Sequence, residues 1–257
     1  MRISHRYKFV FLSHARTGSQ TVRRLLDPFS DVTSVHYSQT DETNPFYNHI
    51  SALELKNEFD RRCWDWSAYR KFCFTRNPWE RVVSLYHHFV RGWKSKRDIT
   101  TAMDDGADHG VTRVTTLSGK ASRVLKRLVP AFHEHCVSMT ANEIAPSFKE
   151  YVSWLPEAEK KEWSHPSDIR TSLKYFACDT EGNLLLDDVI PLEKIGEDLP
   201  RVLGELSIPL DGKQIPWLDK TGNRDCRSYY DKDSADIVSS VYEYEIRGFG
   251  YSFDGLP

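Results

Sequence analysis

Largely apolar runs alternate with amphipathic stretches along this chain, and the alternation predicts strands that are followed by helices. Residues 8–12 and 70–75 are short apolar runs of the kind found in buried parallel strands. The pattern also predicts a strand at 32–36 and helices at 19–26, 50–59, 121–129, 147–154, 193–206 and 234–247. Strands that alternate with helices predict a three-layer α/β fold, in which a central, mainly parallel sheet is flanked by helices on both faces.

A further helix has a clear start signal just after the run at 70–75. Asn77 can cap this helix, Pro78 suits its first position, and Glu80 stands where a capping box places its acid. An apolar stripe follows at Val82, Leu85, Phe89 and Trp93. The spacing therefore places residue 76 at a corner between a strand and a helix.

The length and composition predict one globular domain over residues 1–257. Hydrophobic residues make up 39% of the chain and charged residues 28%, which is ordinary for a globular protein. Residues 94–120 are polar and contain glycine, so we expect an excursion from the domain there. Residues 174–178 and 184–190 flank a turn sequence at 179–183, which predicts a small C-terminal hairpin.

The charge and the cysteines exclude several classes of protein. The formal net charge is -2, so no strong global field attracts the chain to nucleic acid, and any anion site must be local. Five scattered cysteines without a C-x-x-C pair disfavour a disulfide framework or structural zinc and favour a reducing compartment. Residues 133–136 read His-Glu-His-Cys, but histidines two positions apart face apart on a helix, so solvated surface is favoured over a metal site.

Hydropathy and the first residues bear on the location of the protein. No apolar run approaches the ~20 residues that a membrane-spanning helix needs. Residues 1–7 lead directly into the first strand and leave no room for a signal peptide. We therefore expect a soluble, cytoplasmic protein, unless an anchor has been removed.

The corner after residues 8–12 has the chemistry of an anion site. A strand that stops at a helix N-terminus directs backbone N–H groups and the positive end of the helix dipole to one point. Gly18 lets the backbone approach an anion closely, and Arg16 adds a cation with fork geometry. Further donors stand at Thr17, Ser19, Gln20 and Thr21. A plain turn with a strain-relieving glycine is the alternative, and a Walker loop is excluded because no lysine follows Gly18.

The second corner carries another arginine and another hydroxyl. Arg76 stands beside a helix N-terminus, where its guanidinium can grip a phosphate through two hydrogen bonds. Ser84, two turns into the helix, can donate to the same group, whereas we expect Arg81 to be solvated or paired with a carboxylate such as Glu80. Two such corners suit a ligand with two separate anionic groups, which points to a nucleotide with phosphates at both ends.

Residues 15–21 and 76–86 together resemble the cofactor-binding elements of the sulfotransferases, particularly the carbohydrate and heparan sulfate 2-O type, which use PAPS (3′-phosphoadenosine 5′-phosphosulfate). The resemblance implies a P-loop-like fold in which Arg76 and Ser84 hold the 3′-phosphate. It implies that the 5′-phosphosulfate is cradled by the first loop, with Arg16, Thr17, Gly18, Ser19, Gln20 and Thr21. The family usually has lysine where Arg16 stands, and arginine keeps the charge without the compact ammonium group.

A weaker resemblance identifies a candidate general base. Residues 47–51 are similar to the segment that carries the base in the family, which implies His49 for this role, since an imidazole titrates near neutrality. His14, inside the first loop, is the competing candidate. A histidine that merely caps the helix at 50–59 is the alternative for His49.

The resemblance also extends toward the C-terminus, at residues 187–199, 229–230 and 248–251. Residues 94–146 show little of it, so we interpret them as a variable insertion that faces the acceptor. Residues 220–224 form a basic loop, which either closes over the nucleotide or is ordinary surface.

The resemblance implies an enzyme that moves a sulfuryl group from PAPS to a hydroxyl of a carbohydrate or glycoconjugate. Arg16 and backbone amides would neutralise the leaving oxygen, so no metal is required. Arg16 also supports a second hypothesis, a protein that binds PAPS or its product but is catalytically weakened. A P-loop kinase for small molecules is the third, and it lacks a magnesium-binding pair.

Overall fold

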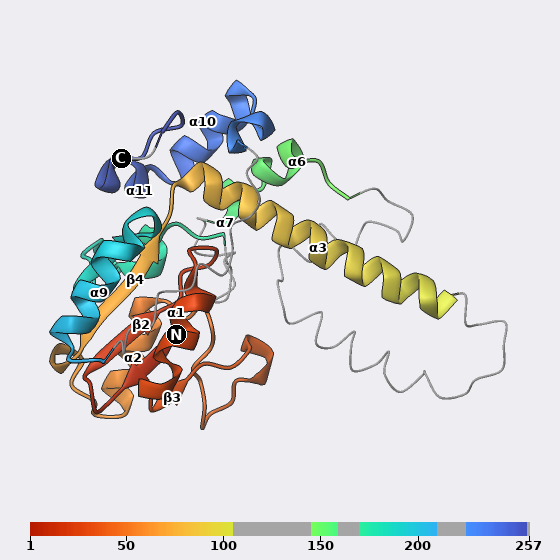
Figure 1. Ribbon diagram of the computed structural model, residues 1–257. Helices are drawn as coiled ribbons and strands as arrows, with labels where there is room; N and C mark the ends of the chain where they lie inside the picture. Colours follow the sequence, from red (N-terminus) through yellow and green to blue (C-terminus); the bar gives the residue numbers. More distant parts are fainter. Residues whose placement is uncertain (105–144, 159–169, 210–224, 256–257) are drawn as a thin grey trace.

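A computed structural model describes residues 1–104, 145–158, 170–209 and 225–255 of the chain (Figure 1). In this part of the chain the strands form a five-stranded sheet, in the order β3-β1-β2-β4-β5. The strands are β1 (Arg2–Ser4), β2 (Phe9–Leu12), β3 (Val32–Thr33), β4 (Arg70–Thr75) and β5 (Asp188–Pro191). β4 is parallel to β2 and β5, whereas β1 is antiparallel to β2 and β3. All strands except β1 therefore point the same way, and the predicted mainly parallel sheet is confirmed.

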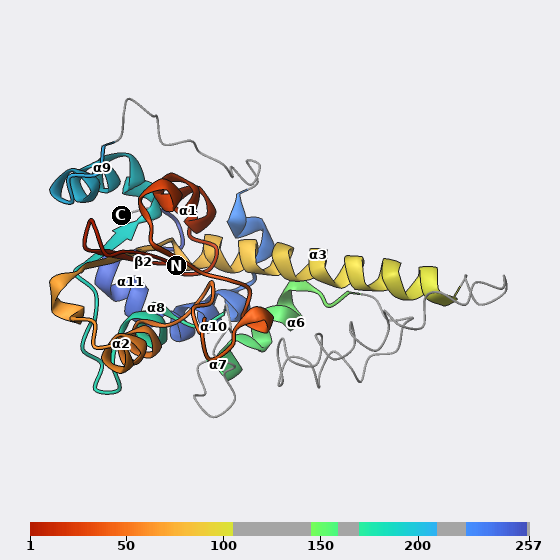
Figure 2. The same ribbon diagram turned by 90° about the horizontal axis from the view of Figure 1, so that it is seen from below.

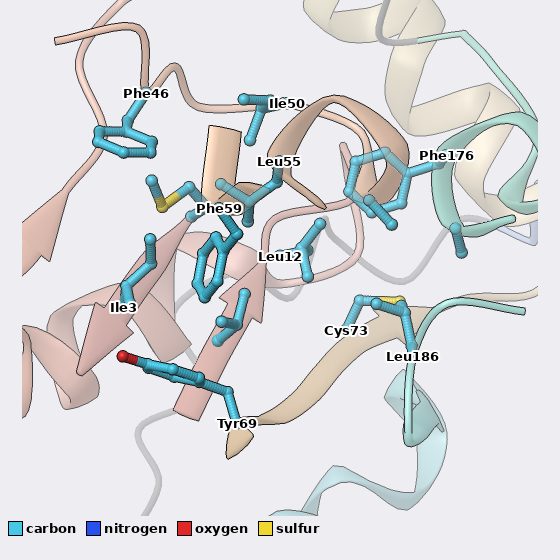
Figure 3. Close-up of a cluster of buried hydrophobic side chains, with 14 of the residues drawn as sticks. Ile3, Leu12, Phe46, Ile50, Leu55, Phe59, Tyr69, Cys73, Phe176 and Leu186 are labelled. Carbon is cyan, nitrogen blue, oxygen red and sulfur yellow. The ribbon is translucent and has the colours of Figure 1, made fainter. Parts of the chain in front are cut away.

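Helices cover both faces of the sheet. They are α1 (Ser19–Leu26), α2 (Ala52–Arg61), α8 (Leu173–Ala177) and α9 (Ile195–Glu205). Because side chains alternate along a strand, Val10 and Leu12 point to one face and pack in a cluster with α2 and α8, drawn in Figure 3. Phe9 and Phe11 pack on the other face with α1 and α9. Figure 2 shows the two helix pairs on opposite sides of the strands, so the three-layer α/β fold is confirmed.

A third hydrophobic cluster surrounds the start of the helix that follows β4. Its helices are α3 (Pro78–Asp104), α6 (Phe148–Ser153), α7 (Leu155–Ala158), α10 (Lys232–Val241) and α11 (Glu243–Phe249). Val82 and Leu85 of α3 pack there in a cluster with Tyr151 and Val238. Beyond this cluster α3 projects away from the sheet (Figures 1 and 2). Short 3₁₀ helices occur at Asp27–Phe29, Tyr37–Gln39, Trp66–Ala68, Leu192–Lys194 and Cys226–Tyr229.

Two helices differ in extent from the prediction. Residues 94–104, predicted as an excursion, continue α3 to Asp104, because the segment contains no glycine or proline that would end the helix. The rest of that excursion and the helix predicted at 121–129 lie outside the described residues. The terminal helix predicted at 234–247 is divided at Tyr242 into α10 and α11.

The predicted C-terminal hairpin is reduced to a turn. The strand predicted at 174–178 is wrong, because most of it belongs to α8, which buries Leu173, Phe176 and Ala177 at helical spacing. The turn at 179–183 is present and is closed by one isolated antiparallel bridge between Cys178 and Leu184.

The outer strands on the β3 side are shorter than a hydrophobic pattern can reveal. β1 was not predicted at all, and β3 covers only the first two residues of the strand predicted at 32–36. An apolar–polar alternation over only two or three positions is indistinguishable from the sequence pattern of a loop. The buried central strands β2 and β4 were predicted because each is a longer apolar run.

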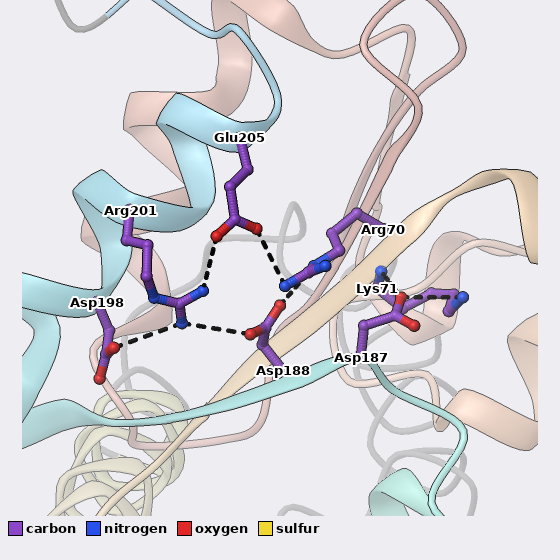
Figure 4. Close-up of polar contacts among 7 residues, drawn as sticks. All are labelled: Arg70, Lys71, Asp187, Asp188, Asp198, Arg201 and Glu205. Atoms are coloured by element: carbon purple, nitrogen blue, oxygen red, sulfur yellow. Dashed lines mark hydrogen bonds and ion pairs between the residues drawn. The ribbon is translucent and has the colours of Figure 1, made fainter.

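A network of ion pairs joins α9 to the sheet where β4 and β5 begin (Figure 4). Arg70 donates to Asp188 at 2.7 Å and lies 3.1 Å from Glu205. Arg201 of α9 pairs with the same two carboxylates, at 3.3 Å and 3.1 Å. Partly exposed pairs stabilise little one by one, but a network of this kind fixes α9 against the two strands at the end opposite the corners.

Candidate active site

The two corners between strand and helix lie side by side at one edge of the sheet. β2 and β4 are adjacent and parallel, so the segments that follow them leave the same edge. From the first corner, Arg16 Nε donates to Ser84 Oγ at 2.9 Å. From the second, Arg81 Nε donates to the Ala15 carbonyl at 3.0 Å. The two sequence motifs are thus joined by contacts in both directions.

The backbone of the first corner is tightly folded. Arg16 and Gly18 both adopt the left-handed conformation, with φ of 64° and 75°. A Cβ at Gly18 would lie 2.8 Å from Leu192 Cδ1, so a larger residue would have to displace the Leu192 side chain and also adopt an unfavourable φ. Thr17 is buried, and its hydroxyl donates to the His14 carbonyl at 2.8 Å, so this side chain braces the loop from within.

The N-terminus of α1 opens at this corner. Ser19 and Thr21 are buried, whereas the Gln20 side chain is exposed. The Thr21 N–H reaches back to the Gly18 carbonyl at 3.2 Å, and the N–H groups before it have no acceptor within the helix. The corner therefore offers backbone donors and the positive end of the helix dipole, which together bind anions.

At the second corner Arg76 is paired with Glu80. The Arg76 Nε and a terminal nitrogen donate to one Glu80 carboxylate oxygen, at 3.1 Å and 3.0 Å. Asn77 caps α3 as predicted, because its side chain accepts from the Trp79 N–H at 3.1 Å. The predicted capping box is wrong, since the Asn77 N–H donates to Glu193 instead, at 3.0 Å. Glu80 is thereby left to Arg76.

Arg81 is placed differently from the expectation. It was expected in solvent or beside Glu80, but its side chain is 2% exposed. It donates to the carbonyls of Ala15 and Thr171, each at 3.0 Å, and its guanidinium lies 5.3 Å from the centre of the Tyr242 ring. The available sequence signal was its position three residues before Ser84, which puts both side chains on one face of α3.

His49 lies beside the first corner. Its Nδ1 is 2.7 Å from the Ser13 carbonyl, which can only accept, so Nδ1 carries the proton and Nε2 is the acceptor of the neutral ring. Burial, the largest effect, lowers the pKa of His49 to about 4 against the opposing hydrogen bond to Ser13, and the charges of Arg23 and Arg81 lower it further. Capping is not its role, because Ser51 caps α2.

His14 is buried beneath the same corner. Its ring stacks on Phe176, with ring centres 4.7 Å apart and planes 24° apart. Its Nε2 lies 3.2 Å from the Thr171 carbonyl, which also accepts from Arg81. Burial, and then the Arg81 charge, hold the pKa of His14 well below its usual range. His14 is therefore a packed neighbour of Arg81.

Arg23 of α1 lies near the candidate base and was not predicted as a site residue. Its guanidinium donates to the Asn48 side-chain oxygen, and Asn48 directly precedes His49. Burial and the Arg2 charge lower the pKa of Arg23. Its place one turn into α1, after the loop donors, was the only signal in the sequence.

A sequence profile of the sulfotransferase family matches residues 1–176, more than half of the chain. This chain belongs to the sulfotransferase family. The family transfers sulfuryl groups with PAPS as the donor, and the matched range includes both corners and His49. No curated protein and no solved structure matches the chain.

The corners of this sulfotransferase suit a donor that carries anionic groups at both ends of an adenosine. The glycine at position 18 lets the loop backbone lie close to Leu192, and the first N–H groups of α1 are the backbone donors that can meet an anion at this corner. The Ser84 hydroxyl accepts from Arg16 and keeps its own proton to donate to a second group. The residues present therefore fit the donor of the family.

The described part of the chain holds neither a cluster of metal ligands nor a membrane-spanning helix. Among the described residues, no group of three or more His, Cys, Asp or Glu side chains is placed to hold a metal ion. The described helices include none that is long and apolar enough to cross a bilayer. Residues 133–136 and the basic loop at 220–224 lie outside the described residues.

Proposed function

We propose that this sulfotransferase moves the sulfuryl group of PAPS to a hydroxyl of a saccharide. The observation that carries the proposal is the 2.9 Å contact between Arg16 and Ser84. It brings together the first loop, for the 5′-phosphosulfate, and the start of α3, for the 3′-phosphate. One adenosine nucleotide can then be held at both ends.

Each corner would hold one end of the donor. Arg16 and the N–H groups from Thr17 to Gln20 bind the 5′ end, where the helix dipole also favours negative charge. Arg76 and Ser84 bind the 3′-phosphate, with Arg76 turning from the Glu80 carboxylate to the phosphate. When bound, the donor supplies the sulfuryl group, and the chain supplies its orientation and the neutralisation of charge.

His49 is the general base of the proposal. The hydrogen bond to Ser13 leaves Nε2 unprotonated, so this atom can take the proton of an acceptor hydroxyl. A pKa of about 4 keeps the ring neutral near pH 7 and makes it a weak base in the free enzyme. An anionic donor beside the ring would raise that pKa, because negative charge stabilises the imidazolium. The base is therefore strengthened when the donor is in place.

A groove supports a saccharide as the acceptor. It has a volume of about 340 Å³ and runs between α2 and the segment before it, and Tyr47 and Ile50, which flank His49 in the sequence, line it. Aromatic rings offer apolar faces to a sugar, while carboxylates and amides accept hydrogen bonds from its hydroxyls. Both kinds of group line the groove, at Tyr37, Asp41, Tyr47, Glu54 and Asn57.

Calorimetry with the product nucleotide PAP (3′-phosphoadenosine 5′-phosphate) tests the donor site. We expect the wild type to bind PAP and Arg76→Ala to bind it about tenfold to a hundredfold more weakly, since a charged hydrogen-bond partner is lost. Arg24→Ala is the matched control, because Arg24 is exposed on α1, and its affinity should not change. Equal affinities of all three proteins would contradict the proposed site.

Product analysis tests the reaction. We expect PAPS and a panel of neutral glycosides to give a sulfated sugar and PAP, detected by mass spectrometry, and the yield to survive treatment with a chelator. A panel of phenols and a sulfated polysaccharide serve as the comparison acceptors. Sulfation confined to the phenols would overturn the saccharide assignment, whereas sulfation of the polysaccharide would support it. An absence of product from every hydroxyl would overturn the function.

A further inference from the structure

Arg81 is a buried cation, and its guanidinium contacts backbone carbonyls and an aromatic ring. It is 2% exposed, it donates to two backbone carbonyls, and it lies over the Tyr242 ring. A buried charge is unfavourable unless its hydrogen bonds compensate for the lost water, and a Met side chain would occupy similar space without that penalty. The role of Arg81 is therefore to be found in the groups that it holds.

One of those groups is the peptide bond between Ala15 and Arg16. The Ala15 carbonyl accepts from Arg81 Nε at 3.0 Å. In a trans peptide the carbonyl and the N–H point in opposite directions, and no cis peptide is present in the described chain. Since Arg81 holds the Ala15 carbonyl, the N–H of Arg16 is turned away from the buried side of the loop.

The conformation of Arg16 needs such support. Its φ of 64° lies in the left-handed region, which is unfavourable for a residue with a Cβ and persists only where the surroundings hold it. Arg81 holds the backbone just before this residue, and Ser84 accepts from its side chain at 2.9 Å. Arg81 and Ser84 lie three residues apart on one face of α3, so the same helix grips Arg16 at two points.

The other carbonyl ties the loop to the C-terminal part of the fold. Thr171, just before α8, accepts from Arg81 at 3.0 Å and lies 3.2 Å from His14 Nε2. Tyr242, between α10 and α11, supplies the ring beneath the guanidinium. Arg81 thus links the first loop to residues that lie far from it in the sequence.

We propose that Arg81 is a positioning residue for the 5′ half of the donor site. It holds the peptide between Ala15 and Arg16 so that the Arg16 N–H and guanidinium face the leaving phosphate, and it does not itself touch the donor. The 3′ half depends on Arg76 and Ser84 instead. This inference rests on the proposed function, because it assigns the first corner to the 5′ end of the nucleotide.

Two nucleotides that differ only at the 5′ end test the inference. Calorimetry compares PAP with adenosine 3′-monophosphate on the wild type, Arg81→Met and Arg81→Lys. We expect Arg81→Met to weaken PAP about tenfold or more, the effect of losing a charged hydrogen bond, and to change the affinity for the monophosphate less than about threefold. Arg81→Lys keeps the charge but not the fork, so it should recover part of the PAP affinity.

Tyr242→Phe is the matched control for a purely structural role. It removes the 2.6 Å hydrogen bond from Tyr242 to the Arg170 carbonyl in the same buried region and keeps the ring under Arg81. We expect this variant to lose stability and to bind both nucleotides with an unchanged ratio. If Arg81→Met does not fold, Arg81→Lys carries the comparison, and thermal unfolding with adenosine 3′-monophosphate shows that the 3′ half is intact.

The possible results distinguish a failure of the Arg81 inference from a failure of the proposed function. Equal losses of PAP and monophosphate affinity in the Arg81 variants, with a wild type that binds both, overturn the inference and leave the proposed function standing. A wild type that binds neither nucleotide overturns both. In turnover at saturating PAPS we also expect kcat of Arg81→Lys to fall about tenfold, because a misplaced Arg16 stabilises the leaving group less well; an unchanged kcat would contradict the positioning role.

Discussion

At the residue scale, the left-handed conformation of Gly18 disfavours any residue that carries a Cβ. Gly18→Ala combines a φ of 75° with a Cβ placed 2.8 Å from Leu192, so we expect a loss of about 1–3 kcal/mol in the free energy of unfolding. Gly204→Ala on α9 is the control, because a Cβ there meets nothing within 4 Å and alanine favours a helix. Urea unfolding measures the stability of both variants. A Gly18→Ala variant as stable as the wild type would contradict the strain expected at this position.

His49 and its neighbour Ser51 separate catalysis from stability. We expect His49→Ala to lower kcat about a hundredfold or more, the usual effect of removing a general base, and to leave PAP affinity within about twofold. Ser51→Ala removes the cap of α2 and should lower the free energy of unfolding by about 1 kcal/mol with kcat unchanged. Initial rates and calorimetry measure these effects. A fully active His49→Ala variant would show that His49 is not the general base.

The depressed pKa of His49 predicts how stability depends on pH. The unfolded histidine binds a proton near pH 6.5, whereas the folded one stays neutral until about pH 4. The unfolded chain therefore holds more protons in this window, and stability falls as the pH is lowered through it. Thermal unfolding at pH values across the window should show a shallower slope for His49→Gln than for the wild type, and an identical slope would contradict the assigned pKa.

At the element scale, the sequence predicted what is local and missed what depends on partners. The hydrophobic pattern predicted α1 and α9, and a capping signal predicted the start of α3, because these signals lie within a few residues of each other. The strand predicted at 174–178 failed, since burial against α2 and α11 selects a helix there. The predicted capping box did not form, because the Asn77 N–H donates to Glu193, which is distant in the sequence.

The pair that replaced the capping box gives a prediction for the second corner. Glu80 occupies the guanidinium of Arg76, so it competes with a 3′-phosphate. We expect Glu80→Gln to raise PAP affinity about threefold to tenfold and to leave stability nearly unchanged, since a partly exposed ion pair contributes about 0–1 kcal/mol. Asp60→Asn breaks another (i, i+4) pair, with Lys56 on α2, and should leave the affinity as it is. Weaker binding by Glu80→Gln would mean that Glu80 orients Arg76 for the phosphate.

At the scale of the whole molecule, topology explains why the candidate site was partly predictable. Parallel strands release their following segments at one edge, so two corners after parallel strands were expected to be neighbours, and β2 and β4 are adjacent. The reach of Arg81 to Thr171 was not predictable, because it depends on how α8 packs under the loop. The single-domain organisation, the cytoplasmic location and the roles of the site residues stay predictions.

The arrangement of two corners on two βα units predicts how ligands stabilise the fold. A nucleotide that grips both corners links β2 and α1 to β4 and α3, and at about one hundred times its Kd it adds about 2.7 kcal/mol to the free energy of unfolding. For a chain of this size that is a rise of about 5–10 °C in Tm with PAP. Adenosine 3′-monophosphate at the same concentration reaches only the second corner and should raise Tm less.

Arg16→Ala should reduce the rise caused by PAP to the level of the monophosphate, whereas Arg76→Ala should reduce both, as measured by calorimetric or fluorescence unfolding. Equal rises for the two nucleotides with the wild type would show that the first corner does not hold the 5′ end.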